Sequence, residues 1–420
     1  MYQDEDPPPE EDELPRRGSL GLELRASSLE VLRVIPGSTS DVAGVMPGDT
    51  IATIDGERVD DVTQLTKIAR SLRPGAPVVF LVDRLGAPTV LQGTVMPAPV
   101  EEVRGAFVRL GHVEAIDGVY KLRTIATVPI NRPPPFTAVL LLAGLGHGSC
   151  ELSNDPEDPR RRLIEDLTDF GLVTLRVERS GTGDSEGPPA TTTDLFTEIA
   201  GYRAALDALK LESDIEGTIL FGHSVGGMVA PFLAGASSGV TGIAVFGTTA
   251  RKWSDSIIDG TRRQRLLAGT LEGEALEAHV AAWTEMHTRV LTGDLTPEEV
   301  FELNPKLRSL EGPSCTGRTM FGRDVTYFQQ LERLDLVALW RTTQVPVLVM
   351  AGTNDWVISQ DDAQRIASIA PTASIVELEG IGHDMLRHQS LARSFHSARE
   401  GQWDGSVTSA FAAWLDRVRG

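Results

Sequence analysis

The serine at position 224 lies in a setting that suits a catalytic nucleophile. It is the third residue of the hexapeptide GHSVGG (residues 222–227), which fits the pattern G-x-S-x-G. This pattern places a serine in a tight turn between a strand and a helix. Residues 217–221 (GTILF) form a short apolar run typical of a buried strand, and residues 225–233 (VGGMVAPFL) are small and apolar, as in a helix packed on a sheet. We therefore predict that Ser224 attacks the substrate.

A serine hydroxyl is a weak nucleophile at its ordinary pKa, so it needs a neighbouring base that an acid holds in place. In proteins with a serine turn of this kind, the acid follows the serine in the sequence and the histidine follows the acid. His383 comes directly after the strand-like residues 374–378, in a glycine-containing loop that can carry it to the carboxyl end of that strand. His388 and His396 fall in an arginine-containing stretch of helical character, where we expect them to be solvated. His383 is the predicted base.

The acid that would hold this histidine is predicted to be Asp355. It ends the peptide GTND (residues 352–355), directly after the strand-like residues 345–351. Asp361 and Asp362 follow within a few positions, but they suit the first turn of a helix that Ser359 could cap. Asp355 would fix the tautomer of the histidine and stabilise its charged form.

An attacked carbonyl develops an oxyanion, which needs two backbone N–H donors. The first is expected from Val225, the residue after the nucleophile. The second is expected from the loop GLGHG (residues 144–148), which follows the strand-like residues 138–143. Leu145 is the predicted donor there, because the small residues around it let the main chain approach the substrate closely.

Strand-like and helical segments alternate from about residue 103 to residue 420, which predicts a mainly parallel sheet with helices on both faces. The strand-like runs are residues 138–143, 172–176, 218–221, 242–246, 345–351 and 374–378. The helical stretches include residues 160–170, 194–209, 225–234, 360–369 and 406–418. Residues 249–342 interrupt the alternation with helical segments rich in aromatic side chains. We expect this segment to form a cap over the carboxyl ends of the strands, with most of its aromatic residues in the core of the cap itself.

Two further regions precede residue 103. Residues 1–16 are acidic and proline-rich, which predicts a disordered arm. Residues 17–99 alternate short strand-like pieces with turn residues, and residues 62–72 have helical spacing, with Asp60 or Asp61 as a possible cap. Prolines 97 and 99 and an acidic pair mark a boundary near residue 100, before a third region at residues 103–420.

Composition limits the classes of partner. The chain has 420 residues and a formal net charge of −20, which argues against nucleic acid and anionic membranes as partners. It contains no apolar run of the ~18–20 residues that a membrane span needs, and its N-terminus lacks the basic start and apolar centre of a secretory signal. Cys150 and Cys315 are far apart and in no metal-ligand spacing, so we expect free thiols, no metal site and a cytoplasmic location.

Residues 17–99 resemble a PDZ domain, most closely the PDZ modules of bacterial proteases. The resemblance rests on GSLGL (18–22) in the place of the carboxylate-binding loop, and on VIPGS (34–38), AGVMPGDTI (43–51), IDGERV (54–59) and RPG (73–75). It implies that a peptide or protein C-terminus binds by strand addition, with Leu20, Gly21 and Leu22 in the binding loop. The alternative is a domain that only packs on its neighbour.

Residues from about 105 to 420 resemble the α/β-hydrolase superfamily. Besides the serine turn, GTND (352–355) and GH (382–383) match its acid and base motifs. Residues 176–187 (RVERSGTGDSEG) match its D-x-R-G-x-G-x-S-x-G loop, with departures at Glu178 and Ser180, and the oxyanion loop begins with AG (143–144) rather than His-Gly. The resemblance implies the α/β-hydrolase fold with a helical cap. It also implies hydrolysis or acyl transfer on esters, thioesters, amides or peptides, with no metal or organic cofactor.

These patterns lead to the hypothesis of a serine hydrolase that cleaves an ester or thioester of a small-molecule acyl substrate through an acyl-enzyme. One alternative is a serine peptidase or amidase to which the PDZ-like module recruits a peptide. Another is an inactive binding scaffold, against which the intact set of Ser224, Asp355 and His383 argues. A terminal Gly420 would fill an apolar end pocket poorly, which argues against binding of the chain's own tail by the module.

Overall fold

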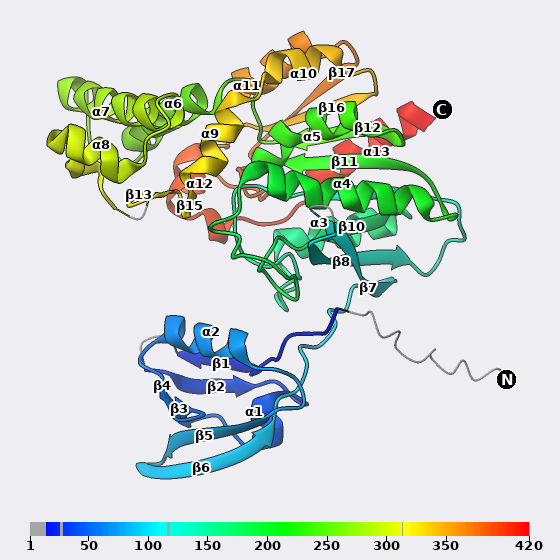
Figure 1. Ribbon diagram of the computed structural model, residues 1–420. Coiled ribbons are helices and arrows are strands. Elements are labelled where there is room, and N and C mark those ends of the chain that lie inside the picture. Colours follow the sequence, from blue (N-terminus) through cyan, green and yellow to red (C-terminus); the bar gives the residue numbers. More distant parts are fainter. Residues whose placement is uncertain (1–13, 26–27, 116–117, 313, 420) are drawn as a thin grey trace. The chain divides into compact units, whose positions relative to one another are not determined.

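The computed structural model describes residues 14–25, 28–115, 118–312 and 314–419. The chain divides into two compact units, Met1–Glu101 and Glu102–Gly420, each with its own sheet (Figure 1). We call them the N-terminal and C-terminal units and describe each by itself.

The N-terminal unit is built on an antiparallel sheet in the order β1-β2-β3-β5-β6, with β4 paired to β3. Its strands are β1 (Leu22–Arg25), β2 (Glu30–Val34), β3 (Thr50–Ile54), β4 (Glu57–Arg58), β5 (Pro77–Arg84) and β6 (Ala87–Thr94). Its helices are α1 (Thr39–Ala43) and α2 (Val62–Ser71). Asp61 caps α2 by accepting a hydrogen bond from the backbone N–H of Gln64 at 2.7 Å, and Leu65 and Ile68 turn into the core. The short helix α1 was not predicted.

The first described residues belong to this unit, so the predicted disordered arm is wrong for residues 14–16. Leu14 is buried, and the Arg16 guanidinium donates to the carbonyl oxygens of Ala98 and Pro99 at 3.1 and 2.9 Å. Composition alone favoured disorder here because the partners of these residues lie more than 80 positions away. The rest of the predicted arm, residues 1–13, lies outside the described residues.

The C-terminal unit contains an eight-stranded sheet in the order β17-β16-β12-β11-β9-β10-β8-β7. Strands β9 to β17 in this sheet pair in parallel, whereas β8 and β7 are antiparallel at one edge. The strands are β7 (Ala106–Ala115), β8 (Tyr120–Pro129), β9 (Phe136–Leu142), β10 (Val173–Val177), β11 (Ile215–His223), β12 (Val240–Phe246), β16 (Val347–Gly352) and β17 (Ala373–Leu378). The prediction of a mainly parallel sheet is confirmed, and the β7–β8 hairpin is an addition to it.

Helices cover both faces of this sheet, as predicted. They are α3 (Pro159–Asp169), α4 (Leu195–Leu211), α5 (Val225–Ala236), α11 (Gln360–Ile369) and α13 (Ser406–Arg419). Two short helices, α12 (Leu391–His396) and η2 (Ala398–Glu400), precede α13 and contact each other. Successive strand residues point to opposite faces. Thus Leu140 belongs to the buried cluster that includes residues of α4, α5 and α11, whereas its neighbour Val139 belongs to the one that includes residues of α3 and α13.

Residues 249–342, which we call the insertion, lie between β12 and β16 (Figure 1). The segment is mostly helical, as predicted, and also contains a three-stranded sheet that was not predicted. Its elements are α6 (Trp253–Leu267), α7 (Gly273–Leu291), α8 (Pro297–Leu303), η1 (Pro305–Leu310), β13 (Cys315–Thr316), β14 (Thr319–Met320), β15 (Arg323–Asp324), α9 (Val325–Arg333) and α10 (Leu336–Thr342). Phe301, Tyr327, Phe328 and Trp340 are fully buried, in one hydrophobic cluster with residues of the eight-stranded sheet and of α4, α5 and α11, so the insertion shares the core of the sheet rather than having a separate one.

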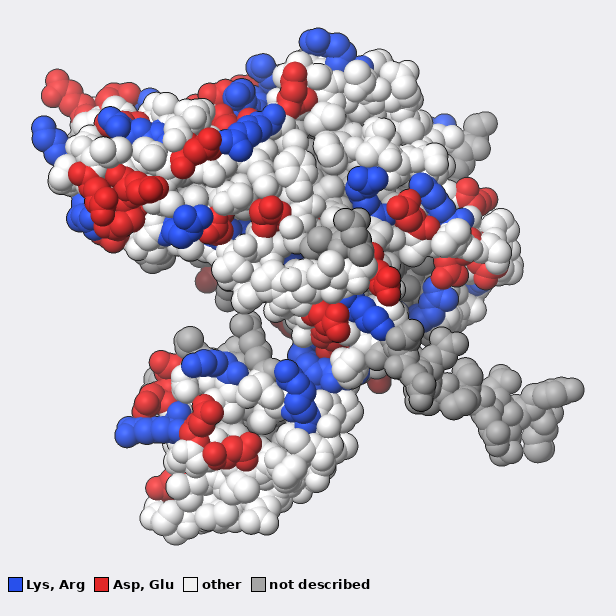
Figure 2. All heavy atoms as spheres, viewed as in Figure 1, with Lys and Arg blue, Asp and Glu red and all other residues white. Residues whose placement is uncertain are grey.

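Acidic and basic side chains are interspersed on the face of the molecule drawn in Figure 2. Exposed ion pairs of the described residues include Arg308 with Glu298 at 2.7 Å. Among the helices of the described residues, none is both long enough and apolar enough to cross a membrane.

Candidate active site

Ser224 occupies a strained turn between β11 and α5. Its backbone angles are φ 54° and ψ −122°, a conformation that costs a residue other than glycine about 1–3 kcal/mol. Glycines make the turn possible. A Cβ atom on Gly222 would lie 2.6 Å from the Cα of Gly227, and one on Gly226 would lie 2.0 Å from the carbonyl oxygen of Leu142. The strand, the turn and the helix are therefore held close to the end of β9.

His383 and Asp355 form a hydrogen-bonded pair at the ends of neighbouring parallel strands. Asp355 follows β16 and His383 follows β17, and the two side chains meet with Nδ1 of His383 2.8 Å from Oδ2 of Asp355. The other carboxylate oxygen of Asp355 accepts from the backbone N–H groups of Val357 and Ile358 at 2.8 and 2.9 Å. The buried carboxylate is thus fixed by its own loop and aimed at the imidazole.

The protonation of His383 reflects two opposed effects. Burial disfavours the charged imidazolium, but the Asp355 carboxylate outweighs it and raises the pKa of His383 above its ordinary value. Because Nδ1 is engaged by Asp355, it carries the proton in the neutral ring and leaves Nε2 as the basic nitrogen. The pair is therefore suited to accept a proton and to stabilise the cation that results.

A second imidazole supports this pair, and it was missed by reasoning from sequence. His223 is the variable residue directly before Ser224, and its Nε2 lies 2.8 Å from the carbonyl oxygen of His383. The rings of His223 and His383 lie 4.9 Å apart between centroids. Burial and the neighbouring charge of His383 lower the pKa of His223 to about 4, so it stays neutral. The only available signal was its place beside the nucleophile in the G-x-S-x-G pattern.

Ser224 and His383 line one cavity of about 760 Å³ at the carboxyl ends of the strands. Val225 and Leu145, the predicted oxyanion donors, line it as well. The insertion contributes Trp253, Ser256, Ile257, Gly260, Gln264, Ser314 and Phe321 to the same lining. The structure therefore brings together the five predicted site residues of the C-terminal unit, with Asp355 bonded to His383.

The loop after β9 runs directly past the nucleophile. A Cβ atom on Gly144 would lie 3.2 Å from the Cβ of Ser224 and 3.5 Å from the carbonyl oxygen of His223. The absence of a side chain at this position is what allows the main chain to approach Ser224 so closely. The predicted donor Leu145 follows immediately, and Val225 begins helix α5, whose first N–H groups have no partner within the helix.

The remaining residues singled out from sequence are not among those that line this cavity. Leu20, Gly21 and Leu22 belong to the N-terminal unit, where Leu20 is buried, Gly21 has a φ of 68° and Leu22 begins the edge strand β1. His396 is exposed, as predicted, but the expectation that His388 is solvated is wrong. His388 is buried because the loop before α12 folds back on itself, and its Nε2 lies 3.0 Å from Oδ2 of Asp384.

Cysteine thiols and metal-binding clusters are two further kinds of site that could carry chemistry. Cys150 and Cys315 are free cysteines, and burial raises the pKa of the Cys315 thiol to about 12. In the part of the chain that the structure describes, no group of three or more histidine, cysteine, aspartate and glutamate side chains is arranged to hold a metal ion.

Comparisons with known proteins place this site in a family. Residues 139–393, more than half of the chain, match the model of the "Alpha/beta hydrolase family". The chain is 22% identical over 284 residues to esterase EstD of Thermotoga maritima, an alignment that covers 67% of this chain and 62% of the relative. It therefore spans less than two thirds of the length of that curated relative.

Two solved structures are similar to this chain at low identity. Est1E of Butyrivibrio proteoclasticus with ferulic acid bound is 16% identical with a TM-score of 0.48, covering 74% of this chain and 99% of that one. A thermophilic esterase of Thermogutta terrifontis with malate bound is 18% identical with a TM-score of 0.43, covering 74% of this chain and 100% of that one. The matched family segment contains Ser224, Asp355 and His383, and the chain belongs to the alpha/beta hydrolase family.

Proposed function

We propose that the chain is a serine hydrolase that cleaves carboxylic esters or thioesters through Ser224, His383 and Asp355. The observation that supports this most directly is that Ser224 and His383 line one cavity. In addition, Oδ2 of Asp355 lies 2.8 Å from Nδ1 of His383. Family membership and the similarity to esterase EstD point to the same class of reaction.

The first half of the reaction forms an acyl-enzyme. The Oγ of Ser224 attacks the carbonyl carbon of the substrate while Nε2 of His383 takes its proton, and the imidazolium is stabilised by Asp355. The tetrahedral oxyanion is bound by the N–H groups of Val225 and Leu145. The bond to the leaving group then breaks, and His383 returns the proton to the departing alcohol or thiol.

The second half repeats these roles with water. Water loses a proton to His383 and attacks the acyl carbon, after which the bond to Ser224 breaks, His383 returns the proton to Oγ of Ser224 and the carboxylic acid leaves. Apolar residues from both the sheet and the insertion line most of the cavity, which suits an acyl chain or an aromatic acid. In this proposal the insertion serves as the cap that shapes the substrate pocket.

The experiment is a panel of p-nitrophenyl esters of graded chain length, acyl-CoA thioesters and aminoacyl anilides, assayed with wild type, Ser224→Ala and Ser256→Ala. Ser256 lines the same cavity and serves as the matched control. We expect ester or thioester turnover and fluorophosphonate labelling in wild type and Ser256→Ala, and neither in a folded Ser224→Ala. Faster anilide cleavage would establish the peptidase alternative, and no labelling of wild type would favour an inactive scaffold.

We also propose that the N-terminal unit is PDZ-like and binds the C-terminus of a peptide or protein. This is supported by the position of β1 at the edge of its sheet, directly after the loop residues Leu20 and Gly21. An edge strand can accept a further strand through its free backbone groups. Titration of the whole chain with labelled peptides should show preference for a free carboxyl terminus over an amidated one, and equal binding of both would reject this role.

A further inference from the structure

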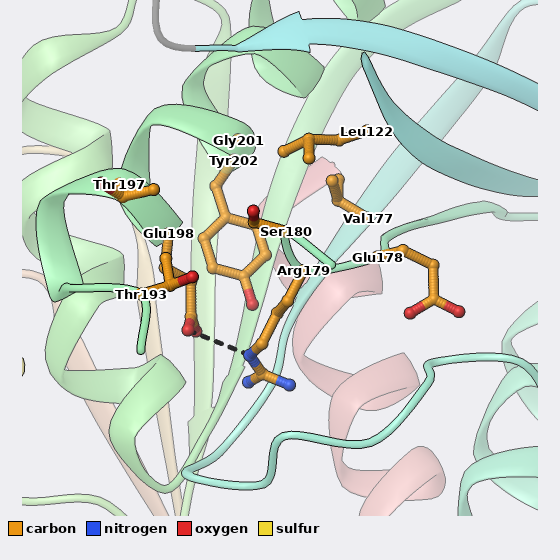
Figure 3. Close-up of a pocket in the computed structure, with 10 residues that line it drawn as sticks. All are labelled: Leu122, Val177, Glu178, Arg179, Ser180, Thr193, Thr197, Glu198, Gly201 and Tyr202. Carbon is orange, nitrogen blue, oxygen red and sulfur yellow. Dashed lines mark ion pairs between the residues drawn. The ribbon is translucent and has the colours of Figure 1, made fainter. Parts of the chain in front are cut away.

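Three buried ionised side chains connect the insertion to the loop that follows β10. Nε of Arg179, in that loop, lies 3.0 Å from the carboxylate of Glu198 in α4. The same carboxylate oxygen accepts a hydrogen bond from Nη1 of Arg323, in β15 of the insertion, at 2.7 Å. The Arg323 guanidinium lies over the ring of Tyr327, 3.8 Å from its centroid. Figure 3 shows the Arg179–Glu198 pair with the ring of Tyr202 beside it.

Arg179 also contacts the main chain next to the nucleophile. Its Nη2 donates to the carbonyl oxygen of Gly144 at 2.6 Å. The preceding residue is held as well, because the backbone N–H of Ala143 donates to the hydroxyl of Tyr202 at 3.2 Å. Two buried side chains therefore fix residues 143 and 144 where they pass Ser224.

The bond to Gly144 has a consequence for the next residue. The carbonyl of Gly144 and the N–H of Leu145 belong to one planar trans peptide, so they point in opposite directions. A guanidinium that fixes the oxygen on one side therefore fixes the direction of the N–H on the other. The positive charge of the guanidinium beside this oxygen also polarises the peptide group, which makes the Leu145 N–H a stronger hydrogen-bond donor.

We propose that Arg179 is a positioning residue that aims the Leu145 N–H at the oxyanion of the tetrahedral intermediate. This inference rests on the proposed function. Glu198 acts behind it as the counter-ion that keeps Arg179 in place, and Arg323 ties the insertion to the same carboxylate. The loop that carries Arg179 thus serves catalysis through the main chain, without touching the substrate.

The charge of Arg179 is secured by its partner. Burial disfavours a charged guanidinium, but the Glu198 carboxylate outweighs burial and raises the pKa of Arg179. The hydrogen bond to Gly144 is therefore charge-assisted over the whole working range of pH.

Arg123 offers a matched control. It is a buried arginine that pairs with Asp184 at 3.0 Å and donates to the carbonyl oxygen of Gly111 at 2.9 Å. Its environment is thus similar to that of Arg179, and its partner Asp184 lies in the same loop, but the carbonyl that it holds lies in β7. Its loss therefore disturbs the loop without removing the contact to Gly144. Loss of either arginine should lower stability, whereas only loss of Arg179 should lower kcat.

The test measures kcat and KM for a p-nitrophenyl ester, and affinity for a trifluoromethyl ketone that forms a tetrahedral adduct. Wild type, Ser224→Ala, Arg179→Gln, Arg179→Lys and Arg123→Gln are compared. Removal of one oxyanion donor costs about a hundred- to a thousandfold in kcat, so misdirecting a donor that remains should cost roughly ten- to a hundredfold. We expect this loss in Arg179→Gln, with a matching loss of ketone affinity, nearly unchanged KM and a smaller loss in Arg179→Lys.

The other outcomes would reject either the positioning role of Arg179 or the proposed function. Unchanged kcat in both Arg179 variants, or an equal loss of kcat in Arg123→Gln, would overturn the positioning role. If neither Arg179 variant folds by circular dichroism, the residue is structural and the proposal is rejected. Absence of ester turnover by wild type would instead reject the proposed function, so the two failures are distinguishable.

Discussion

Nε2 of His223 lies 2.8 Å from the backbone carbonyl oxygen of His383. A carbonyl oxygen can only accept, so Nε2 of His223 must carry the proton of this hydrogen bond. The bond joins the residue before the nucleophile to the residue that is the proposed base, 160 positions later in the chain. It fixes the main chain of His383 relative to the turn at Ser224.

The substitution His223→Phe should therefore lower activity while keeping a ring in the same place. Loss of one hydrogen bond is worth about 1 kcal/mol, and 1.36 kcal/mol in the barrier corresponds to a tenfold change in rate, so kcat should fall roughly five- to tenfold. Steady-state kinetics with a p-nitrophenyl ester measure this, with His396→Phe as the exposed control. An unchanged kcat in His223→Phe would show that Asp355 alone suffices to position His383.

The pH dependence of the reaction should be set by His383. Its pKa is raised above the ordinary value of 6.5, and it acts as a base only when neutral. The value of kcat/KM should therefore rise with pH through a midpoint above 6.5. His223, with a pKa of about 4, should contribute no second step between pH 5 and 9.

Replacing Asp355 with asparagine removes the carboxylate that raises the pKa of His383. The midpoint of the pH profile should move to lower pH, and the plateau rate should fall roughly a thousandfold or more, because the imidazole loses its preferred tautomer. A profile measured from pH 5 to 9 checks both effects. A midpoint that moves upward would show that another group sets the pKa of His383.

The placement of Ser224, Asp355 and His383 in the candidate site was predictable from sequence because its signals are local. The turn at Ser224 is specified by glycines within three positions, and Asp355 and His383 each follow a short apolar strand. Parallel strands place their carboxyl ends at one edge of a sheet, so these loops had to meet once the sheet was predicted.

The contacts that support the site were not predictable in this way. Arg179 was recognised only as part of a loop motif and Gly144 only as part of the oxyanion loop, and its other partner Glu198 carries no signal of its own. His388 is buried through a loop that folds back on itself, which no periodicity reveals. These contacts depend on side chains that meet only after the sheet, its helices and the insertion have packed.

Gly247 lies next to the hydrogen-bonded pair of Asp355 and His383, so a substitution there can test how tightly the pair is packed. A Cβ atom there would lie 3.0 Å from Oδ2 of Asp355 and 3.0 Å from Nδ1 of His383. The substitution Gly247→Ala should therefore push the two side chains apart and lower kcat by about tenfold or more. Ester kinetics under saturating substrate provide the measurement.

Gly269 is a suitable control for that substitution, because the two glycines have φ angles of 59° and 61° and share the same backbone strain. No atom lies within 4 Å of a Cβ atom built on Gly269. Gly269→Ala should lower stability without changing kcat. Equal kcat values in the two variants would show that the pair tolerates the added methyl group.

Asp362 should be more important for stability than its neighbour Asp361. Sequence indicated only a first-turn role for both, but Asp362 is buried and also accepts from Thr249 at 2.6 Å and from Arg251 at 2.8 Å. It thereby joins α11 to the start of the insertion. Asp362→Asn should destabilise the chain by about 2 kcal/mol, because Arg251 loses a charged partner, whereas Asp361→Asn at the exposed position should have little effect.

The effect of Asp362 should also depend on pH in a defined direction. Burial alone would raise its pKa, but hydrogen bonds from Arg251, Thr249 and Ser359 lower it below the ordinary value of 3.8. Its contribution is therefore fully present above the pKa of the unfolded chain and is lost as the pH falls through the folded value. Urea midpoints of wild type and Asp362→Asn should differ most near pH 7 and converge below pH 3.8, and a difference independent of pH would show that the carboxylate acts through packing rather than through its charge.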